Sequence, residues 1–341
     1  MDGRNPKNTS PKDTSIDAIK RREFLVRCAK AGLSVCAAGA LSYWFYDPHG
    51  PQRGSTKQSG GVSLADFSIA GQKPGMGIAR GTDRAQTVRQ AMQAVGGIET
   101  FVKPGDRVLL KVNAAFASPP ALSATTHPQL VAEVTRLCLK AGAVEVIVTD
   151  NPINDPASCF ALTGIARAAE SAGGRVMLPA EPFFSPITLP GARLIRNWPL
   201  LFEPFKSVNK LIGLAPVKDH HRSGASMTMK NWYGLLGGRR NIFHQDINTI
   251  IKELALMVKP TLVILDGTTS MVTNGPTGGS LSDLKETRTM IVSTDQVAAD
   301  AYGASLIGKT AGDLPYIGMA AAAGVGTADY ALLKPVFAPE N

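Results

Sequence analysis

Two short apolar segments joined by an amphipathic helix are the feature that most constrains the fold of this chain. Residues 107–112 follow a turn at residues 103–106 and have the pattern of a strand, and residues 144–149 are nearly continuous in apolar residues, which is typical of strands buried on both faces. Between them, the apolar residues of segment 130–141 keep helical spacing, and Thr126 with Gln129 has the pattern of a capping box that begins a helix. A strand, a helix and a second strand in this order form a βαβ unit, in which the two strands run parallel.

The same alternation continues along the chain, where helical patterns are followed by short apolar segments. Because helices and strands alternate throughout, we expect an α/β fold with a doubly wound, mostly parallel sheet and helices on both faces. The expected helices cover residues 82–95, 156–173, 246–258 and 295–307, and the further strands cover residues 175–178, 210–215, 261–265 and 289–293.

The N-terminal segment resembles the twin-arginine (Tat) export signal of bacteria. Arg21 and Arg22 stand side by side in a basic region, and residues 31–46 form an uncharged, largely apolar stretch. Such a signal implies passage through the Tat translocase as a folded protein and a periplasmic or exported location. The small residues 38–40 fit a cleavage site; an uncleaved leader would instead anchor the protein in the inner membrane.

These features divide the chain into three expected parts. The signal segment covers residues 1–46, and a stretch rich in Gly, Pro, Ser and Gln at residues 47–62 has the composition of a flexible linker. The body, residues 63–335, is expected to be a single α/β domain of one or two lobes.

Charge and cysteine content exclude several classes of protein. The net charge is +9, of which +4 lies in the first 40 residues, and no block of like charges occurs in the body, which argues against a nucleic-acid partner. The chain has four cysteines and no CxxC motif, so it lacks the thiolates for an iron–sulfur cluster of its own. Cys138 and Cys159 of the body are expected to be two separate buried thiols, with a disulfide as the alternative.

Polar side chains follow four of the expected strands. In parallel sheets the ligand crevice lies outside the carboxyl ends of the strands, so these side chains are expected to meet in one place. Turns also favour Asn, Asp and Gly, but turn chemistry does not explain Lys and His at such positions. The residues concerned are Asn113, Asp150, the segment Lys218-Asp219-His220-His221, and Asp266-Gly267.

The segment from Lys218 to Gly238 is the densest in reactive side chains. A glycine-containing loop with hydroxyls and a lysine is suited to cradle a carboxylate or a phosphate. Neighbouring side chains on extended backbone point to opposite sides, so at most one of His220 and His221 is expected to face the crevice. His220 together with Asp266 would hold a divalent or transition metal or perform acid–base chemistry.

Several short motifs together resemble a known family, domain of unknown function 362 (DUF362). The matching residues are Lys111-Val-Asn113, Lys218-Asp-His220, Met229-Lys230-Asn231-Trp-Tyr-Gly234, Asp266-Gly267, Asn274-Gly275-Pro276 and Asp300. The resemblance implies no established activity. Many members of the family are joined to ferredoxin-like cluster domains, which this chain lacks, so a redox partner would have to be a separate protein.

We therefore predict an exported protein that binds, and as an enzyme would transform, a small anionic molecule. In this interpretation His220, Asp266 and Lys230 are the catalytic candidates, with His220 and Asp266 as metal ligands if a metal is present. The substrate-binding candidates are Lys111, Asn113, Lys218, Asn231 and Asn274. The alternative is a non-catalytic ligand- or metal-binding accessory of a periplasmic iron–sulfur redox system, and the sequence leaves open whether the protein is an enzyme.

Overall fold

A computed structural model describes residues 23–33 and residues 61–339 of the chain. The chain divides into two compact units, residues 1–59 and residues 60–341. In the first unit, residues 23–33 are helical and exposed, whereas Arg21 and Arg22 of the predicted export signal lie outside the described residues. None of the described helices has the length and apolar character needed to cross a membrane.

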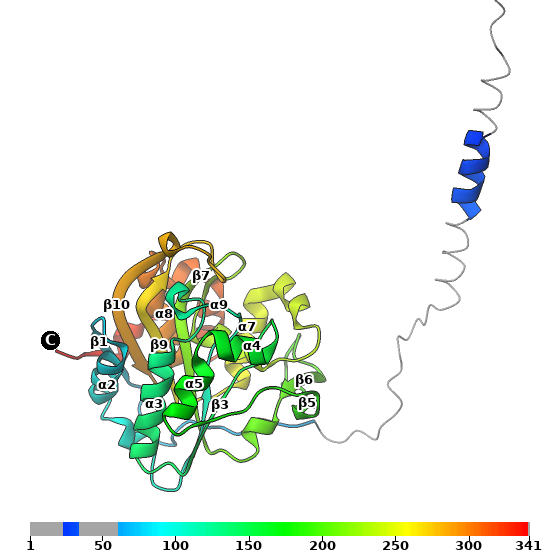
Figure 1. The fold of residues 1–341 in the computed structure, drawn as a ribbon. Coiled ribbons are helices and arrows are strands. Elements are labelled where there is room, and N and C mark those ends of the chain that lie inside the picture. Colours follow the sequence, from blue (N-terminus) through cyan, green and yellow to red (C-terminus); the bar gives the residue numbers. More distant parts are fainter. Residues whose placement is uncertain (1–22, 34–60, 340–341) are drawn as a thin grey trace, which may run out of the picture. The chain divides into compact units, whose positions relative to one another are not determined.

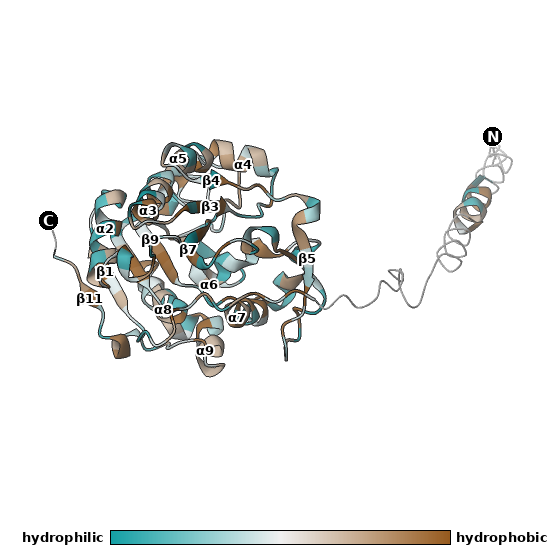
Figure 2. Ribbon diagram, turned by 90° about the horizontal axis from the view of Figure 1, so that it is seen from below, coloured by the Kyte–Doolittle hydropathy of each residue, from teal (hydrophilic) through white to brown (hydrophobic). Residues whose placement is uncertain are grey.

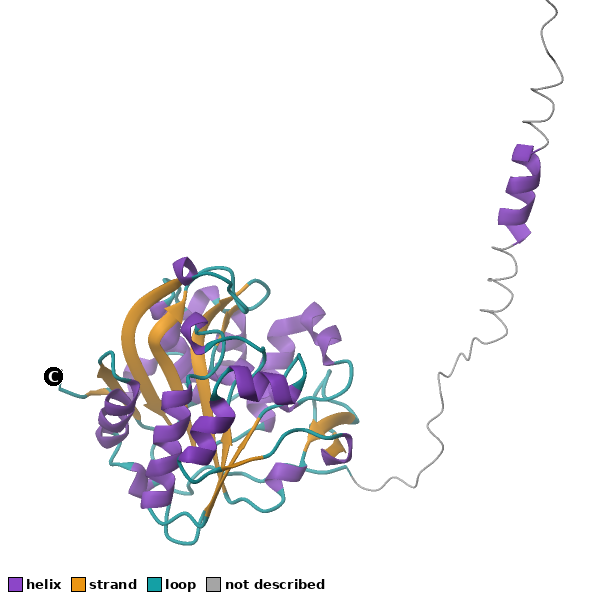
Figure 3. Cartoon of the chain, viewed as in Figure 1, coloured by secondary structure: helices purple, strands orange, loops and turns teal. Residues whose placement is uncertain are grey.

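The second unit is built on a mixed, mostly parallel sheet of nine strands, which confirms the predicted fold class (Figures 1 and 3). Its order is β11-β1-β10-β9-β7-β2-β3-β4, with β8 paired to β7. Within this sheet of described strands, only β10 and β8 run antiparallel to their neighbours. The strands are β1 (Met76–Arg80), β2 (Arg107–Lys111), β3 (Glu145–Thr149), β4 (Arg175–Val176), β7 (Lys210–His220), β8 (Gly224–Ser226), β9 (Leu262–Met271), β10 (Leu284–Ser293) and β11 (Val336–Phe337), beside a separate hairpin of β5 (Phe184–Ile187) and β6 (Trp198–Leu201).

Helices cover both faces of this sheet (Figure 2). One face carries α2 (Arg84–Ala94), α3 (Pro128–Lys140), α4 (Pro156–Leu162) and α5 (Ile165–Ser171), and the other carries α6 (Thr228–Asn231), α7 (Ile247–Met257), α8 (Gln296–Leu306) and α9 (Pro315–Ala322).

The middle positions of the central strands are apolar because both faces of these strands are buried. In β2, Val108 and Leu110 pack in the core under α2 and α3, whereas Leu109 between them packs in the core under α7 and α8. The strands β3 and β9 alternate in the same way. This two-sided burial produces the continuous apolar segments of the sequence.

Two helix boundaries differ from the predictions. The helix expected at residues 156–173 is two helices, α4 and α5, separated at Gly164, whose φ of 72° no helix can continue through. The helix α3 is capped by His127 instead of Thr126. The Thr126 hydroxyl is used elsewhere: it accepts a hydrogen bond from the Asn113 amide and donates one to the Leu214 carbonyl.

The two body cysteines are separate buried thiols, as the first interpretation had it. Cys138 lies on α3 and Cys159 on α4, and both are free. Burial raises the pKa of the Cys138 thiol to about 12, so this group is an inert part of the core.

Candidate functional site

A cavity of about 350 Å³ lies at the carboxyl ends of β2, β3 and β7. The strand order explains its position. From β2 the chain proceeds to β3 and β4 on one side, and then returns to place β7 and β9 on the other side. The boundary between β2 and β7 is therefore the point where the strand order reverses, and at such points the loops leave room for a ligand. We call this space the β2–β7 cavity.

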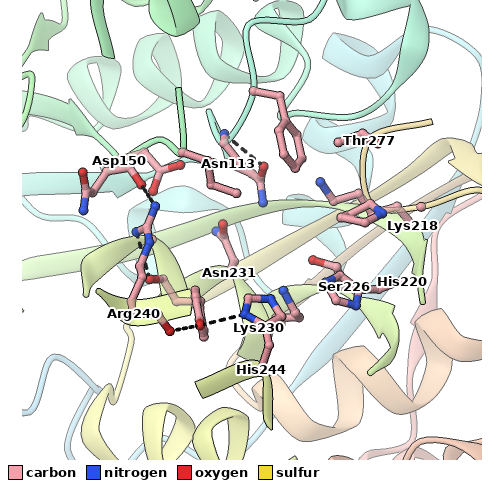
Figure 4. Close-up of a pocket in the computed structure, with 18 of the residues that line it drawn as sticks. Asn113, Asp150, Lys218, His220, Ser226, Lys230, Asn231, Arg240, His244 and Thr277 are labelled. Atoms are coloured by element: carbon pink, nitrogen blue, oxygen red, sulfur yellow. Dashed lines mark hydrogen bonds between the residues drawn. The ribbon is translucent and has the colours of Figure 1, made fainter. Parts of the chain in front are cut away.

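The cavity brings together six of the eight predicted site residues (Figure 4). Asp150 and Arg240 lie on one side in this view, and Lys218 and His220 lie on the other. The predicted residues that line the cavity are Lys111, Asn113, Lys218, His220, Lys230 and Asn231, and further lining residues include Asp150, His221, Ser226, Tyr233, Arg240 and His244.

Lys111 and Asp150 form a buried ion pair at one end of the cavity. The Lys111 Nζ lies 2.8 Å from Asp150 Oδ1, and both side chains are almost completely buried. The same amine donates to the Val112 carbonyl and to both oxygens of Asn231, while Asp150 Oδ2 accepts from the Ala114 amide. Burial lowers the pKa of Lys111, and the nearby Asp150 opposes this shift. The charges of this pair are therefore matched within the protein.

Gly234 allows the chain after α6 to pass directly over this ion pair. A Cβ atom at this position would lie 2.0 Å from Asp150 Oδ1 and 2.8 Å from Lys111 Nζ. Only glycine leaves room for that approach. The Gly234 carbonyl then accepts a hydrogen bond from the Asn151 amide, which fixes the segment over the end of β3.

Lys218 and Lys230 have no carboxylate partner among the described residues. Lys218 is buried, and its Nζ donates to the Ala124 carbonyl and lies 5.2 Å from the Phe116 ring centroid. Lys230 lies half-buried on α6, with its Nζ 5.2 Å from the Tyr233 ring centroid. Desolvation lowers the pKa of Lys218 to about 7, and the charge of Lys230 adds to the effect. Desolvation, with the charges of Arg240 and Lys111, likewise lowers the pKa of Lys230 to about 7.

Both adjacent histidines line the cavity, which corrects the expectation that at most one would do so. The ring centroids of His220 and His221 are 4.9 Å apart and the rings are nearly parallel, because β7 ends at His220 and the chain turns at His221. The His220 Nδ1 accepts hydrogen bonds from the amides of Arg222 and Ser223. This fixes the neutral tautomer that carries its proton on Nε2, and desolvation lowers the pKa of His220 to about 2.

Arg240 is a lining residue that the sequence analysis missed. Its guanidinium donates to four backbone carbonyls, those of Tyr233, Leu236, Asn151 and Pro152. These bonds join the segment after α6 to the segment after β3, and they leave the charge of Arg240 without a carboxylate partner. The adjacent arginines at positions 239 and 240, next to two glycines, were the one local signal.

Asp266 does not lie at the end of a strand, and it does not pair with His220. The strand β9 continues to Met271 because β10 pairs with it along its length. Strand alternation places Asp266 on the same face as Ile264, where its Oδ2 lies 2.8 Å from Arg84 Nε and its Oδ1 accepts from the Thr268 amide. The proposed metal pair is therefore not formed. Within residues 23–33 and 61–339, no three or more His, Cys, Asp or Glu side chains are grouped as a metal site.

Asn274 is also absent from the cavity lining, although its neighbours are part of it. Asn274 is exposed and donates from Nδ2 to Asp283 Oδ1, which holds the loop together. The next residues, Gly275, Pro276 and Thr277, do line the cavity. A Cβ atom at Gly275 would lie 1.9 Å from the Asp219 carbonyl oxygen, so glycine is what lets this loop reach the end of β7.

Asp300 does not line the cavity and instead binds the first residues of α6. Its carboxylate accepts hydrogen bonds from the amides of Thr228 and Met229 and from the Thr228 hydroxyl. Desolvation raises the pKa of Asp300 to about 7. Through these bonds Asp300 positions the short helix that carries Lys230 and Asn231.

Comparison with known proteins identifies a family and a curated relative. The family model described as a domain of unknown function, DUF362, matches residues 108–305, which is more than half of the chain. A protein of Synechocystis sp. named thylakoid-associated protein sll1697 is 28% identical over 227 residues, covering 63% of this chain and 67% of that protein.

Two solved structures show a distant likeness. A protein from Thermotoga maritima has a TM-score of 0.33 and 11% identity, covering 55% of this chain and 51% of its own. The lactate racemase apoprotein from Thermoanaerobacterium thermosaccharolyticum has a TM-score of 0.37 and 12% identity, covering 69% of this chain and 57% of its own. The chain thus spans a little more than half of the length of these two structures.

Proposed function

The chain belongs to the DUF362 family, whose description carries no activity, and we propose that this protein binds a small anion, a carboxylate or a phosphate, in the β2–β7 cavity. One observation carries the proposal: among the described residues that line the cavity, four cationic side chains face a single carboxylate. The cations are Lys111, Lys218, Lys230 and Arg240, and the carboxylate is Asp150.

The imbalance of charge has an electrostatic cost that an anion would remove. Asp150 is already engaged by Lys111, so Lys218, Lys230 and Arg240 have no counter-charge of their own in the cavity. Cations enclosed together without a counter-charge repel one another and lose hydration. A bound carboxylate or phosphate would offset both effects and accept hydrogen bonds from the two amines.

The remaining lining groups fit a small polar ligand. Asn113 and Ser226 offer neutral hydrogen-bonding groups, and the neutral His220 can donate from Nε2. A volume of about 350 Å³ lies at the lower end of the range for small-molecule sites. The proposed ligand is therefore a compact metabolite instead of a nucleotide or a polymer.

Calorimetric titration tests this proposal directly. We expect phosphate, or a small carboxylate such as lactate, to bind the protein with a stoichiometry of one. Lys218→Met should weaken the binding at least about tenfold, because one charged hydrogen bond is lost. Lys73 is exposed, so Lys73→Met is the matched control and should leave the affinity unchanged. Absence of binding for every small anion tested, or equal binding by both variants, would contradict the proposal.

We also propose that the protein works outside the cytoplasm. The paired arginines at positions 21 and 22 support this, as does the name of the Synechocystis relative, which is thylakoid-associated. Replacing both arginines by lysine should retain the protein in the cytoplasmic fraction, whereas Arg4→Lys should not. Normal export of the double variant would overturn the assignment. A Tat translocase and a separate ferredoxin-like protein remain the proposed partners.

A further inference from the structure

The three lysines of the β2–β7 cavity differ in how their amines are held. Lys111 pairs with Asp150 and has three further acceptors. Lys218 donates to the Ala124 carbonyl. The Lys230 amine forms neither a hydrogen bond nor an ion pair with any of the described residues. Its Nζ lies over the Tyr233 ring, 5.2 Å from the ring centroid. Of the three lysine amines, that of Lys230 is therefore the one that no described protein group holds by a hydrogen bond, so it is free to react with a ligand.

The surroundings of Lys230 favour the neutral amine. Desolvation by burial lowers the pKa of Lys230 to about 7, and the positive charges of Arg240 and Lys111 add to this effect. At neutral pH a large part of the Lys230 amines is then in the neutral –NH₂ form, whereas an exposed lysine is almost entirely in the charged –NH₃⁺ form. A lysine that is desolvated beside other cations is the usual form of an amine nucleophile.

We propose that Lys230 is a nucleophile that condenses with the carbonyl group of a small oxo acid to form an imine. This inference rests on the proposed function, because the carboxylate of the same molecule is what the cavity cations would hold. Lys218 is the donor for that carboxylate, with Arg240 contributing charge. The substrate class is therefore a compact molecule with both a carboxylate and an aldehyde or ketone group.

The step balances without an oxidant or a reductant. The Lys230 lone pair attacks the carbonyl carbon, and one amine proton moves to the carbonyl oxygen to give a carbinolamine. The second amine proton leaves with the hydroxyl group as water, and a C=N bond replaces the C–N bond. The His220 Nε2–H is available in the same cavity to donate a hydrogen bond to the departing oxygen, since Nδ1 already accepts from two amides.

Reductive trapping tests the inference on the native full-length protein. The protein is incubated at pH 8 with glyoxylate or pyruvate and cyanoborohydride, and the labelled lysines are located by peptide mass spectrometry. We expect one adduct per chain at Lys230, with a mass gain equal to the oxo acid less one oxygen atom. Its rate should exceed that at any surface lysine by at least about tenfold, because an exposed amine is mostly protonated at this pH.

Variants and a binding assay distinguish the possible failures. Lys230→Met should abolish the fast adduct while Lys73→Met retains it, and circular dichroism checks that both variants fold. Lactate has no carbonyl group to attack, so it should bind and slow the labelling without forming an adduct.

Binding of lactate and pyruvate with no fast adduct, or an adduct on Lys218 or spread over surface lysines, would overturn the imine assignment and leave the proposed function standing. Failure of any anion to bind would overturn both.

Discussion

Two clusters of buried charge in this protein both contain polar residues that follow an apolar strand segment in the sequence, but their charges are balanced differently. At β9, Asp266 meets Arg84 at 2.8 Å, and the two charges cancel. In the β2–β7 cavity, Lys218 and Lys230 enter without a carboxylate of their own. The first arrangement is complete within the protein and stabilises the junction of α2 with the sheet. The second is incomplete, and an incomplete set of buried charges is what points to a ligand.

The largest expected effect comes from breaking the matched pair beside the cavity. Asp150→Asn leaves the Lys111 ammonium buried with only neutral acceptors, which should lower the free energy of unfolding by about 4 kcal/mol. Chemical denaturation measures this change. The exposed Glu286, which pairs with Arg288 on the surface, provides the control: Glu286→Gln should change stability by less than about 1 kcal/mol. Equal effects of the two substitutions would show that Lys111 does not depend on Asp150.

Substitution of Asp266 should lower the stability of the protein and leave its affinity for anions unchanged. Asp266→Asn removes the partner of Arg84, a side chain that is only 11% exposed, and should cost about 3 kcal/mol of unfolding free energy. Anion affinity, measured by calorimetry, should stay within about twofold of the original value. A large loss of affinity would return Asp266 to the binding site, where the sequence analysis first placed it.

Removing a cation that has no carboxylate partner should increase the stability of the protein, in contrast to the two substitutions above. Lys218→Met replaces a buried, repelled ammonium by an apolar side chain of similar length and should raise the free energy of unfolding by about 2 kcal/mol in the absence of anion. The same variant loses anion affinity, so stability and function move in opposite directions. If Lys218→Met destabilises the protein, the lysine is a structural residue held by the Ala124 carbonyl.

The last prediction concerns the pH dependence of anion affinity. A bound anion favours protonated lysines, so affinity is full below pH 7 and falls as pH rises through about 7, the pKa of Lys218 and Lys230. The decline should approach about tenfold per pH unit for each proton that binding requires. The other charged or titratable lining groups are Lys111, Asp150, Arg240, His220, His221 and His244, and desolvation lowers the pKa of both His220 and His244. Constant affinity from pH 6 to 9 would contradict the assignment.

The sequence predicted the fold class and most elements because two-sided burial leaves a strong apolar pattern. It underestimated β7 and β9 for a specific reason. The apolar runs stop at residues 215 and 265, but pairing with β8 and β10 carries the strands on to His220 and Met271. The extensions contain polar residues such as Lys218 and Asp266, and strand pairing at such positions leaves no apolar pattern in the sequence.

The sequence predicted those site residues that lie at the carboxyl ends of β2, β3 and β7 and on α6, but it did not predict the others correctly. Asp266 was misplaced because its strand continues past it and turns its side chain toward α2. Arg240 was missed because its partners, the carbonyls of Asn151 and Pro152, lie almost 90 residues away in the chain. Only the folded chain shows which cations end up matched and which do not.

The measurement that tests the central claim most directly is calorimetric titration of the protein with lactate or phosphate at pH 7.5 in two buffers of different ionisation enthalpy. If unmatched lysines hold the anion, binding must take up protons, and the observed enthalpy will differ between the two buffers by an amount that gives the number of protons bound. We predict binding with net proton uptake; the number of protons taken up is smaller in Lys218→Met and unchanged in Lys73→Met. No binding, or binding with the same enthalpy in both buffers, would contradict the account.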